Sequence, residues 1–318
     1  MVPPAARLLK QGLGVLLGVA SLSGALLIVQ SRSSGAEVAA FSGPHTASAT
    51  PNPALYGYWL AGSDGGVFSF GSARFYGSAA NLHLQAPIVG ITPTADRGGY
   101  WLVASDGGVF SFGDAAFYGS IPGLGISPDD SPVLPRLNAP IVGMVPTTDG
   151  KGYFLVAADG GVFAFGDATF EGSCPGIGGC SSGVSAVMTD GSGGGYWVVT
   201  YTGNVYAFGD ATNYGDPAVY LPYATQVPSA VRTPSGNSYW ILFSDGEVYT
   251  YGDAAYLGSP FGQVQFSNPA SAIFATSDGG GYWVVTANGT VYAFGDAPND
   301  GDISAAHLNG PIVAATGT

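Results

Sequence analysis

Four aspartates stand at one position of a repeated sequence, each directly before a glycine, and are the first candidates for chemistry: Asp64, Asp106, Asp159 and Asp245. Thr202 and Asn288 replace the aspartate in two further copies. A ring of carboxylates could bind Ca²⁺, which prefers several oxygen ligands. Asp before Gly also accepts backbone hydrogen bonds within its own turn. We favour the turn role and keep a Ca²⁺-stabilised structural module as an alternative.

A second set of aspartates follows Phe-Gly or Tyr-Gly, with Ser72 in the first copy: Asp114, Asp167, Asp210, Asp253 and Asp296. A structural turn requires its residue in every copy, whereas a catalytic residue is normally needed once. We therefore assign these aspartates to turns as well.

Two connections depart from the repeat and are better candidates for specificity, because loops carry function more often than the frame that holds them. One is an insertion over residues 123–135, and the other is the loop between Cys174 and Cys180. Both occupy the same connection in adjacent repeats, so we expect them side by side on one face. Two cysteines at this spacing in an exported chain favour a local disulfide over a metal or redox pair.

The predicted ligand-binding surface combines these connections with the neighbouring turns and with a tyrosine that could stack on a sugar ring. Its residues are Asp106, Asp159, Asp129, Asp130 and Tyr118. The aromatic residues of a recurring GYW motif could also stack on sugars, but a fixed strand position in each copy favours packing between repeats. They are Trp59, Trp101, Trp197, Trp240 and Trp283, with Phe154 in the remaining copy.

Recognisable metalloprotease and nucleotide-binding motifs are missing, since the sequence holds no HExxH and no phosphate loop. The histidines His45, His83 and His307 fall in a linker and in connections, where we expect exposed side chains. We predict no catalytic residue and no cofactor. Paired carboxylates could still serve a secreted glycoside hydrolase or lyase, which we keep as an alternative.

The elements that would position these residues form a repeat of about 43 residues. The tyrosine of the GYW motif falls at positions 58, 100, 153, 196, 239 and 282, and the one long interval coincides with the insertion. Each copy divides into four short apolar runs, which in the second copy are residues 87–91, 100–104, 109–112 and, more weakly, 117–118. This period and content predict an all-β, six-bladed β-propeller with four-stranded blades over residues 57–318.

The first and last repeats are incomplete in complementary ways. The GYW unit at Gly57 has no apolar run before it, while the final run, Pro311 to Thr316, has no GYW unit after it. We therefore predict that residues 311–316 complete the first blade and close the ring, which leaves no free sheet edge.

The repeat GYWLVASDGGVFSFGDAAFYGS, from Gly99 to Ser120, resembles a Gly- and aromatic-rich tandem repeat of exported actinobacterial proteins. A following PIVGM segment at Pro140 is also similar. The resemblance implies a β-propeller and an exported protein, and it covers residues 57–316. Members of that family are mostly of unknown function, so the resemblance implies no activity.

Composition and charge exclude several classes of protein. The chain has 52 glycines and 22 prolines among 318 residues, which opposes a helical bundle, yet 46% of its residues are hydrophobic, which opposes disorder. Beyond residue 40, five basic residues face 20 acidic ones. A surface this acidic repels phosphate backbones, so we exclude nucleic acid as a partner.

The N-terminal sequence has the pattern of an export signal. Arg7 and Lys10 precede an uncharged apolar stretch from Gln11 to Ser31, and Val38-Ala39-Ala40 follows the pattern of a cleavage site. The stretch is also long enough to span a bilayer as a helix, so residues 1–40 are predicted to be either a cleaved signal peptide or a membrane anchor. Residues 41–56 are predicted to be a linker.

These observations predict an exported protein, secreted or held at the cell surface, whose propeller binds a cell-envelope partner through one loop face. The partner is a glycan or a protein, and the protein is expected to have no enzymatic activity. The hydrolase or lyase and the Ca²⁺-stabilised module remain the alternatives.

Overall fold

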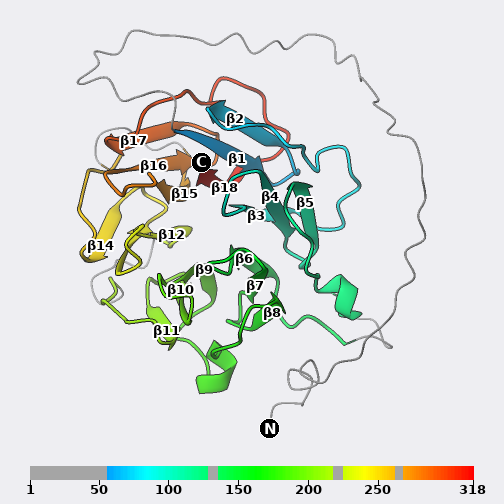
Figure 1. The fold of residues 1–318 in the computed structure, drawn as a ribbon. Helices are drawn as coiled ribbons and strands as arrows, with labels where there is room; N and C mark the ends of the chain where they lie inside the picture. Colours follow the sequence, from blue (N-terminus) through cyan, green and yellow to red (C-terminus); the bar gives the residue numbers. More distant parts are fainter. Residues whose placement is uncertain (1–55, 128–134, 218–224, 262–267) are drawn as a thin grey trace. The chain divides into compact units, whose positions relative to one another are not determined.

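The structure is a computed structural model that describes residues 56–127, 135–217, 225–261 and 268–318 (Figure 1). The described residues all belong to one compact unit, Gly43–Thr318. The predicted N-terminal helix, the leader 1–40, nearly all of the linker, and Asp129 and Asp130 lie outside the described residues. Within the described residues, no helix is long and apolar enough to cross a membrane.

The fold is all-β and contains six antiparallel sheets, each with an inner, a middle and an outer strand. Sheet 1 contains β18 (Ile312–Gly317), β1 (Gly57–Gly62) and β2 (Val67–Gly71). Sheet 2 contains β3 (Ile88–Pro93), β4 (Gly99–Ala104) and β5 (Val109–Gly113), and sheet 3 contains β6 (Ile141–Pro146), β7 (Gly152–Ala157) and β8 (Val162–Gly166).

The remaining sheets repeat this plan. Sheet 4 contains β9 (Val184–Thr189), β10 (Gly195–Thr200) and β11 (Val205–Gly209), and sheet 5 contains β12 (Ser229–Arg232), β13 (Ser238–Leu242) and β14 (Val248–Gly252). Sheet 6 contains β15 (Ala270–Ala275), β16 (Gly281–Thr286) and β17 (Val291–Gly295). Two 3-10 helices, η2 (Pro122–Leu124) and η3 (Cys174–Ile177), lie in connections between sheets.

The inner strands form a closed ring in which each contacts the next, in the order β18, β3, β6, β9, β12, β15 and back to β18 (Figure 1). The closing strand β18 comes from the C-terminus and pairs antiparallel with β1, placing Trp59 opposite Thr316 and Leu60 opposite Ala315. The predicted ring closure is therefore confirmed, and the arrangement is propeller-like.

The middle strands are completely buried, which explains their continuous apolar sequence. The tryptophans of the GYW motif are at most 1% exposed, and Phe154 is 5% exposed. Each of these aromatic side chains packs against the GYW tyrosine of the following sheet, with ring centroids 5.0–5.9 Å apart. This contact is repeated between all six pairs of neighbouring sheets. They form the core between sheets, as predicted.

The predicted fourth strand of each sheet is wrong. The residues expected there form an outermost segment without strand pairing: 75–77, 117–119, 170–172, 213–215, 256–258 and 299–301. Side chains satisfy its backbone instead. Trp101 Nε1 donates to the carbonyl of Ala116 just before the segment, and the Tyr153 hydroxyl of the next sheet donates to the carbonyl of Gly119.

Candidate functional site

One face of the domain carries both the hairpins that join middle to outer strands and the connections to the next inner strand. We call it the connection face. The amide of Ile121 donates to Gly107 O at 3.1 Å, and the amide of Cys174 donates to Gly160 O at 3.2 Å. The hairpins of Asp106 and Asp159 therefore lie directly against the two unusual connections.

Glycine is required in these hairpins for the connections to pack. Gly107 has φ +80°, and a Cβ there would lie 2.2 Å from the side chain of Ile121. Gly160 has φ +77°, and a Cβ there would lie 2.3 Å from Cys174 Sγ. The residue after each aspartate is thus fixed by backbone conformation and by close packing.

Each hairpin aspartate is engaged in its own turn. Asp106 Oδ1 accepts the amide of Gly108 at 2.8 Å, and Asp159 Oδ1 accepts that of Gly161 at 2.9 Å. Asp64 and Asp245 make the same bond at 3.0 and 3.1 Å. Across the described residues, no three His, Cys, Asp or Glu side chains form a group that could hold a metal ion.

The predicted disulfide is present between Cys174 and Cys180, whose Cα atoms lie 5.1 Å apart. Cys174 is fully buried under the Asp159 hairpin, while Ile177, inside the bridged loop, is 57% exposed. The disulfide therefore holds an apolar side chain out from the connection face.

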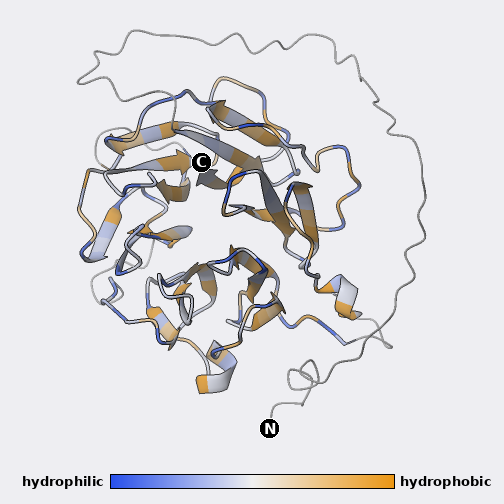
Figure 2. Cartoon of the chain, in the orientation of Figure 1, coloured by the Kyte–Doolittle hydropathy of each residue, from blue (hydrophilic) through white to orange (hydrophobic). Residues whose placement is uncertain are grey.

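Exposed apolar side chains recur on the connections of this face. Leu82 is 52% exposed, Leu124 is 39% exposed, and Phe261 is 50% exposed. Together with Ile177 they place one such residue on each of four connections among the described residues, and in Figure 2 the mostly pale η2 and η3 each show an orange, hydrophobic portion. His83 and His307 are exposed in connections, as expected.

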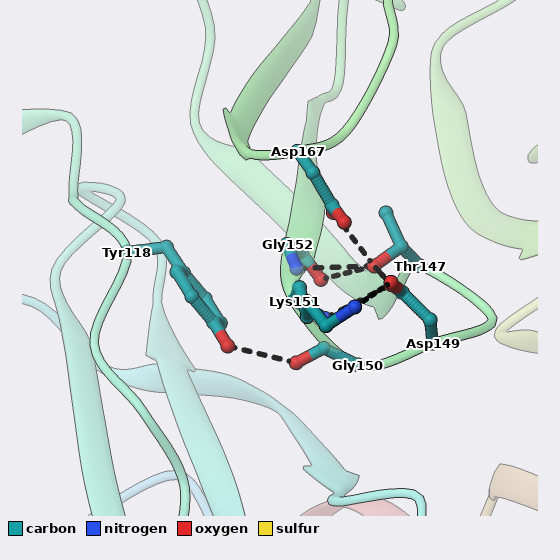
Figure 3. A network of polar contacts seen from close by, with 7 residues as sticks. All are labelled: Tyr118, Thr147, Asp149, Gly150, Lys151, Gly152 and Asp167. Atoms are coloured by element: carbon teal, nitrogen blue, oxygen red, sulfur yellow. Dashed lines mark hydrogen bonds and ion pairs between the residues drawn. The ribbon is translucent and has the colours of Figure 1, made fainter.

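Tyr118 is not part of the connection face. Its hydroxyl donates to the carbonyl of Gly150 at 3.0 Å, in the turn between β6 and β7 (Figure 3). Its ring packs edge-on against Tyr153. This turn lies at the opposite strand ends from the Asp106 hairpin. The structure therefore does not bring Tyr118 together with Asp106 and Asp159, because the outermost segment runs between the two faces.

The opposite face, which we call the turn face, carries the turns between inner and middle strands. In sheet 3, Thr147 Oγ1 lies 3.1 Å from both Asp149 Oδ1 and Asp167 Oδ1 and accepts the amide of Gly152 at 3.0 Å (Figure 3). Asp167 belongs to the second aspartate set, so this carboxylate ties the end of the outer strand to the turn. Hydrogen bonds from Lys151 lower the pKa of Asp149 to about 2.

A cavity of about 520 Å³ lies among the inner strands and extends to the turn face. All six inner strands line it, and Arg97 and Arg232 are its charged lining residues within the described chain. Reasoning from the sequence missed this cavity. One signal was available, because Arg232 stands in a strand position where other copies hold Pro93, Pro146 or Ala275.

No family model matches the chain, and no curated protein matches it. Among solved structures, the chain is similar to the β-propeller domain of Cps50 (Swd1) from Myceliophteria thermophila. The two share 11% identity with a TM-score of 0.48, over 77% of this chain and 81% of that chain. The likeness is distant and concerns the fold alone.

Proposed function

We propose that this chain is an exported six-bladed β-propeller that binds a protein of the cell envelope through its connection face and does so without catalysis. The observation that carries the proposal is the set of exposed apolar side chains on that face: Leu82, Leu124, Ile177 and Phe261. Apolar side chains grouped on one surface of a domain are a common feature of protein-binding sites.

The connection face is also the surface on which the repeats differ. The connections vary in length, and in the described part of the chain two contain 3-10 helices, whereas the hairpins beside them keep one geometry. A scaffold of similar units gains specificity where the units diverge. Aliphatic side chains prevail at these positions, and they favour a protein over a glycan, since sugar rings stack on aromatic faces.

The carboxylates of this face support binding rather than acid–base chemistry. Asp106 and Asp159 each already accept a backbone amide within a tight turn. A general acid or base needs a carboxyl group free to reach a substrate proton.

Export is supported by the N-terminal sequence and by the disulfide. In residues 1–40, two basic residues precede an apolar stretch that is followed by a small-residue site, and Cys174 is paired with Cys180. Disulfides persist in oxidising compartments and are rare in reducing ones. We therefore place the domain outside the cell, either released or anchored.

The test compares two triple variants of the full chain in retention on immobilised envelope fractions of the source organism. One replaces Leu82, Leu124 and Ile177 with serine on the connection face. The matched control replaces Phe75, Phe117 and Phe170 with serine; these are 51–59% exposed on the outermost segments. We expect the protein fraction to retain the control variant as it retains the natural chain, and to lose the connection-face variant.

Two outcomes would overturn the proposal. Equal retention of both variants by the protein fraction would place the binding surface elsewhere. Retention by purified cell-wall glycan with none by envelope protein would make the domain a glycan-binding module.

A further inference from the structure

We propose that the cavity among the inner strands is a second binding site, which takes a small organic carboxylate with an apolar body and holds its carboxylate on Arg232. The volume of about 520 Å³ lies within the range of roughly 300–1,000 Å³ typical of small-molecule sites. The site is separate from the connection face and does not depend on its function.

The charge of the cavity lining is opposite to that of the chain. The protein carries a net charge of −13, yet the lining residues of the described chain include two arginines and no Asp, Glu, Lys or His. A cavity whose only charged lining groups are positive attracts anions.

Arg232 has donors free for a ligand. It is half-buried at the end of β12, and the hydrogen bond of its guanidinium within the described chain goes to the adjacent carbonyl of Thr233, at 3.4 Å. The described residues contain no ion pair of Arg232. Burial lowers the pKa of Arg232, an effect that the nearby Asp190 opposes. A planar guanidinium matches the two oxygens of a carboxylate.

Asp190, whose charge raises the pKa of Arg232, already has its own hydrogen-bond partners. Its Oδ1 accepts the amides of Gly193 at 2.7 Å and Gly195 at 3.3 Å, and its Oδ2 accepts the Ser192 hydroxyl at 2.6 Å. Asp190 therefore stabilises its own turn and leaves the arginine without a bonded carboxylate in the described structure.

A hydroxyl stands beside the arginine at the same level of the ring. Thr189 in β9 lies opposite Tyr196, as Arg232 in the neighbouring β12 lies opposite Tyr239. Thr189 lines the cavity, is 5% exposed, and makes no side-chain hydrogen bond to any described residue. Its hydroxyl can donate to an oxygen held by the arginine.

At its connection-face end the wall of the cavity is apolar on sheets 1, 2, 3 and 5 and carries hydroxyl groups on sheets 4 and 6. Sheets 1, 2 and 3 contribute Val313, Val89 and Val142, whereas sheets 4 and 6 contribute Ser185 and Ser271 at the equivalent position. Sheet 5, between the two serines, holds Pro228 at this position and carries Arg232 four residues further along, at the turn-face end of β12. This division suits an amphipathic ligand whose apolar body lies against the valines.

Arg97 at the turn-face end of the cavity supports the same ligand charge. Its φ is +61°, the only positive value of a non-glycine residue in the described chain, and four other turns hold Gly150, Gly193, Gly236 and Gly279 at this position. A side chain there is unfavourable for the fold. Sheets 2 and 5 are three places apart in the ring of six, so Arg97 and Arg232 lie on opposite sides of the cavity.

The experiment measures the binding of phenylacetate to the full chain in an uncharged detergent, by calorimetry and by thermal unfolding. The comparison probes are 2-phenylethanol, which lacks the charge, and inorganic phosphate, which lacks the apolar body. The variants are Arg232→Gln, Arg232→Lys and Arg97→Gly, and Arg74→Gln is the control, because Arg74 is exposed and outside the cavity lining.

We expect phenylacetate to bind and Arg232→Gln to weaken it by about tenfold or more, as loss of a charge-assisted contact does. Arg232→Lys should give an intermediate affinity, because it keeps the charge and loses the planar fork. Arg97→Gly should weaken binding by a smaller factor while raising the Tm, and Arg74→Gln should change neither. Envelope retention of all four variants should match the natural chain.

Three results would overturn the proposal: no binding of phenylacetate, equal binding by folded Arg232→Gln, or binding of inorganic phosphate as tight as that of phenylacetate. A Tm within a few degrees of the natural chain shows that the Arg232→Gln variant is folded.

Discussion

The inner strand and the outermost segment of each sheet are held in place by different kinds of hydrogen bond. At the inner edge, a regular strand pairs with the middle strand along its length, as β18 does with β1. Beyond the outer strand, the outermost segment has no ladder and is held by side chains, such as the Trp101 indole and the Tyr153 hydroxyl. The inner strand is held by backbone pairing with the middle strand, whereas the outermost segment is held by aromatic side chains of the middle strands.

The outer arrangement links the sheets in a circle. The Tyr153 hydroxyl accepts the amide of Tyr118 at 3.2 Å and donates to Gly119 O, so one phenol satisfies two backbone groups of the preceding repeat. The GYW tyrosine of every sheet donates to the equivalent glycine carbonyl. The difference between the edges shows that these tyrosines replace a fourth strand and join neighbouring sheets together.

Removal of the closing strand tests the inner edge and should have the largest effect. Deleting residues 311–318 would leave β1 unpaired on one side and remove Ile312, which is fully buried. We expect loss of the cooperative thermal transition and of the near-UV circular dichroism signal, because an open ring exposes a strand edge and core. The Thr318→Ala variant is the control, and a cooperative transition retained after the deletion would contradict ring closure by β18.

Alkaline pH tests the outer edge in all sheets together. Burial raises the pKa of Tyr196 and of Tyr282 to about 12, and it raises the pKa of Tyr58, Tyr100 and Tyr153 in the same direction. The unfolded chain ionises its tyrosines near pH 10. The contribution of the buried, protonated tyrosines to the free energy of unfolding is therefore complete below pH 10 and is lost as the pH rises towards 12.

Urea unfolding at pH 8 and at pH 11.5 would measure this loss, and phenolate absorbance at 295 nm would follow ionisation. We expect the buried tyrosines to ionise together with unfolding. Ionisation of all tyrosines near pH 10 with the fold intact would show that the hydroxyls are not held as described.

Removing a single tyrosine hydroxyl should have the next largest effect on stability. Tyr153→Phe leaves the amide of Tyr118 and the carbonyl of Gly119 without their partner, and should lower the free energy of unfolding by about 2–3 kcal/mol. Tyr76→Phe is the matched control, since its hydroxyl makes an exposed bond to Arg97 O and should contribute under about 1 kcal/mol. Equal effects in urea unfolding would contradict the proposed importance of the buried position.

The indole bond should give the smallest effect. Trp101→Phe removes the 2.8 Å bond to Ala116 O and should reduce the free energy of unfolding by about 1–2 kcal/mol. Sheet 3 already has Phe154 at this position, so Phe154→Trp offers the reverse change and should stabilise the fold by up to about 1 kcal/mol. A loss of stability in Phe154→Trp would show that sheet 3 has been repacked around phenylalanine.

The repeat itself could be predicted from the sequence, and so could the disulfide. Tyrosine spacing identified six units, and continuous apolar runs such as Tyr100 to Ala104 marked middle strands that are buried on both sides. Ring closure followed from counting, because one unit lacked an inner strand and one strand lacked a unit. Local patterns suffice for these features because each depends on residues close together in the chain or on their number.

Contacts between distant repeats could not be predicted in this way. Phe117-Tyr118 has the composition of a strand, but the amide of Tyr118 donates to the Tyr153 hydroxyl of the next sheet, and its own hydroxyl donates to Gly150 O on the turn face. Arg97 and Arg232 belong to opposite sheets and line the same cavity only because the ring of sheets closes. Local sequence therefore determined the number of repeats and the inner, middle and outer strands of each. Tertiary structure decided that the fourth segment is not a strand and which residues share a cavity, because both depend on side chains brought together across the ring.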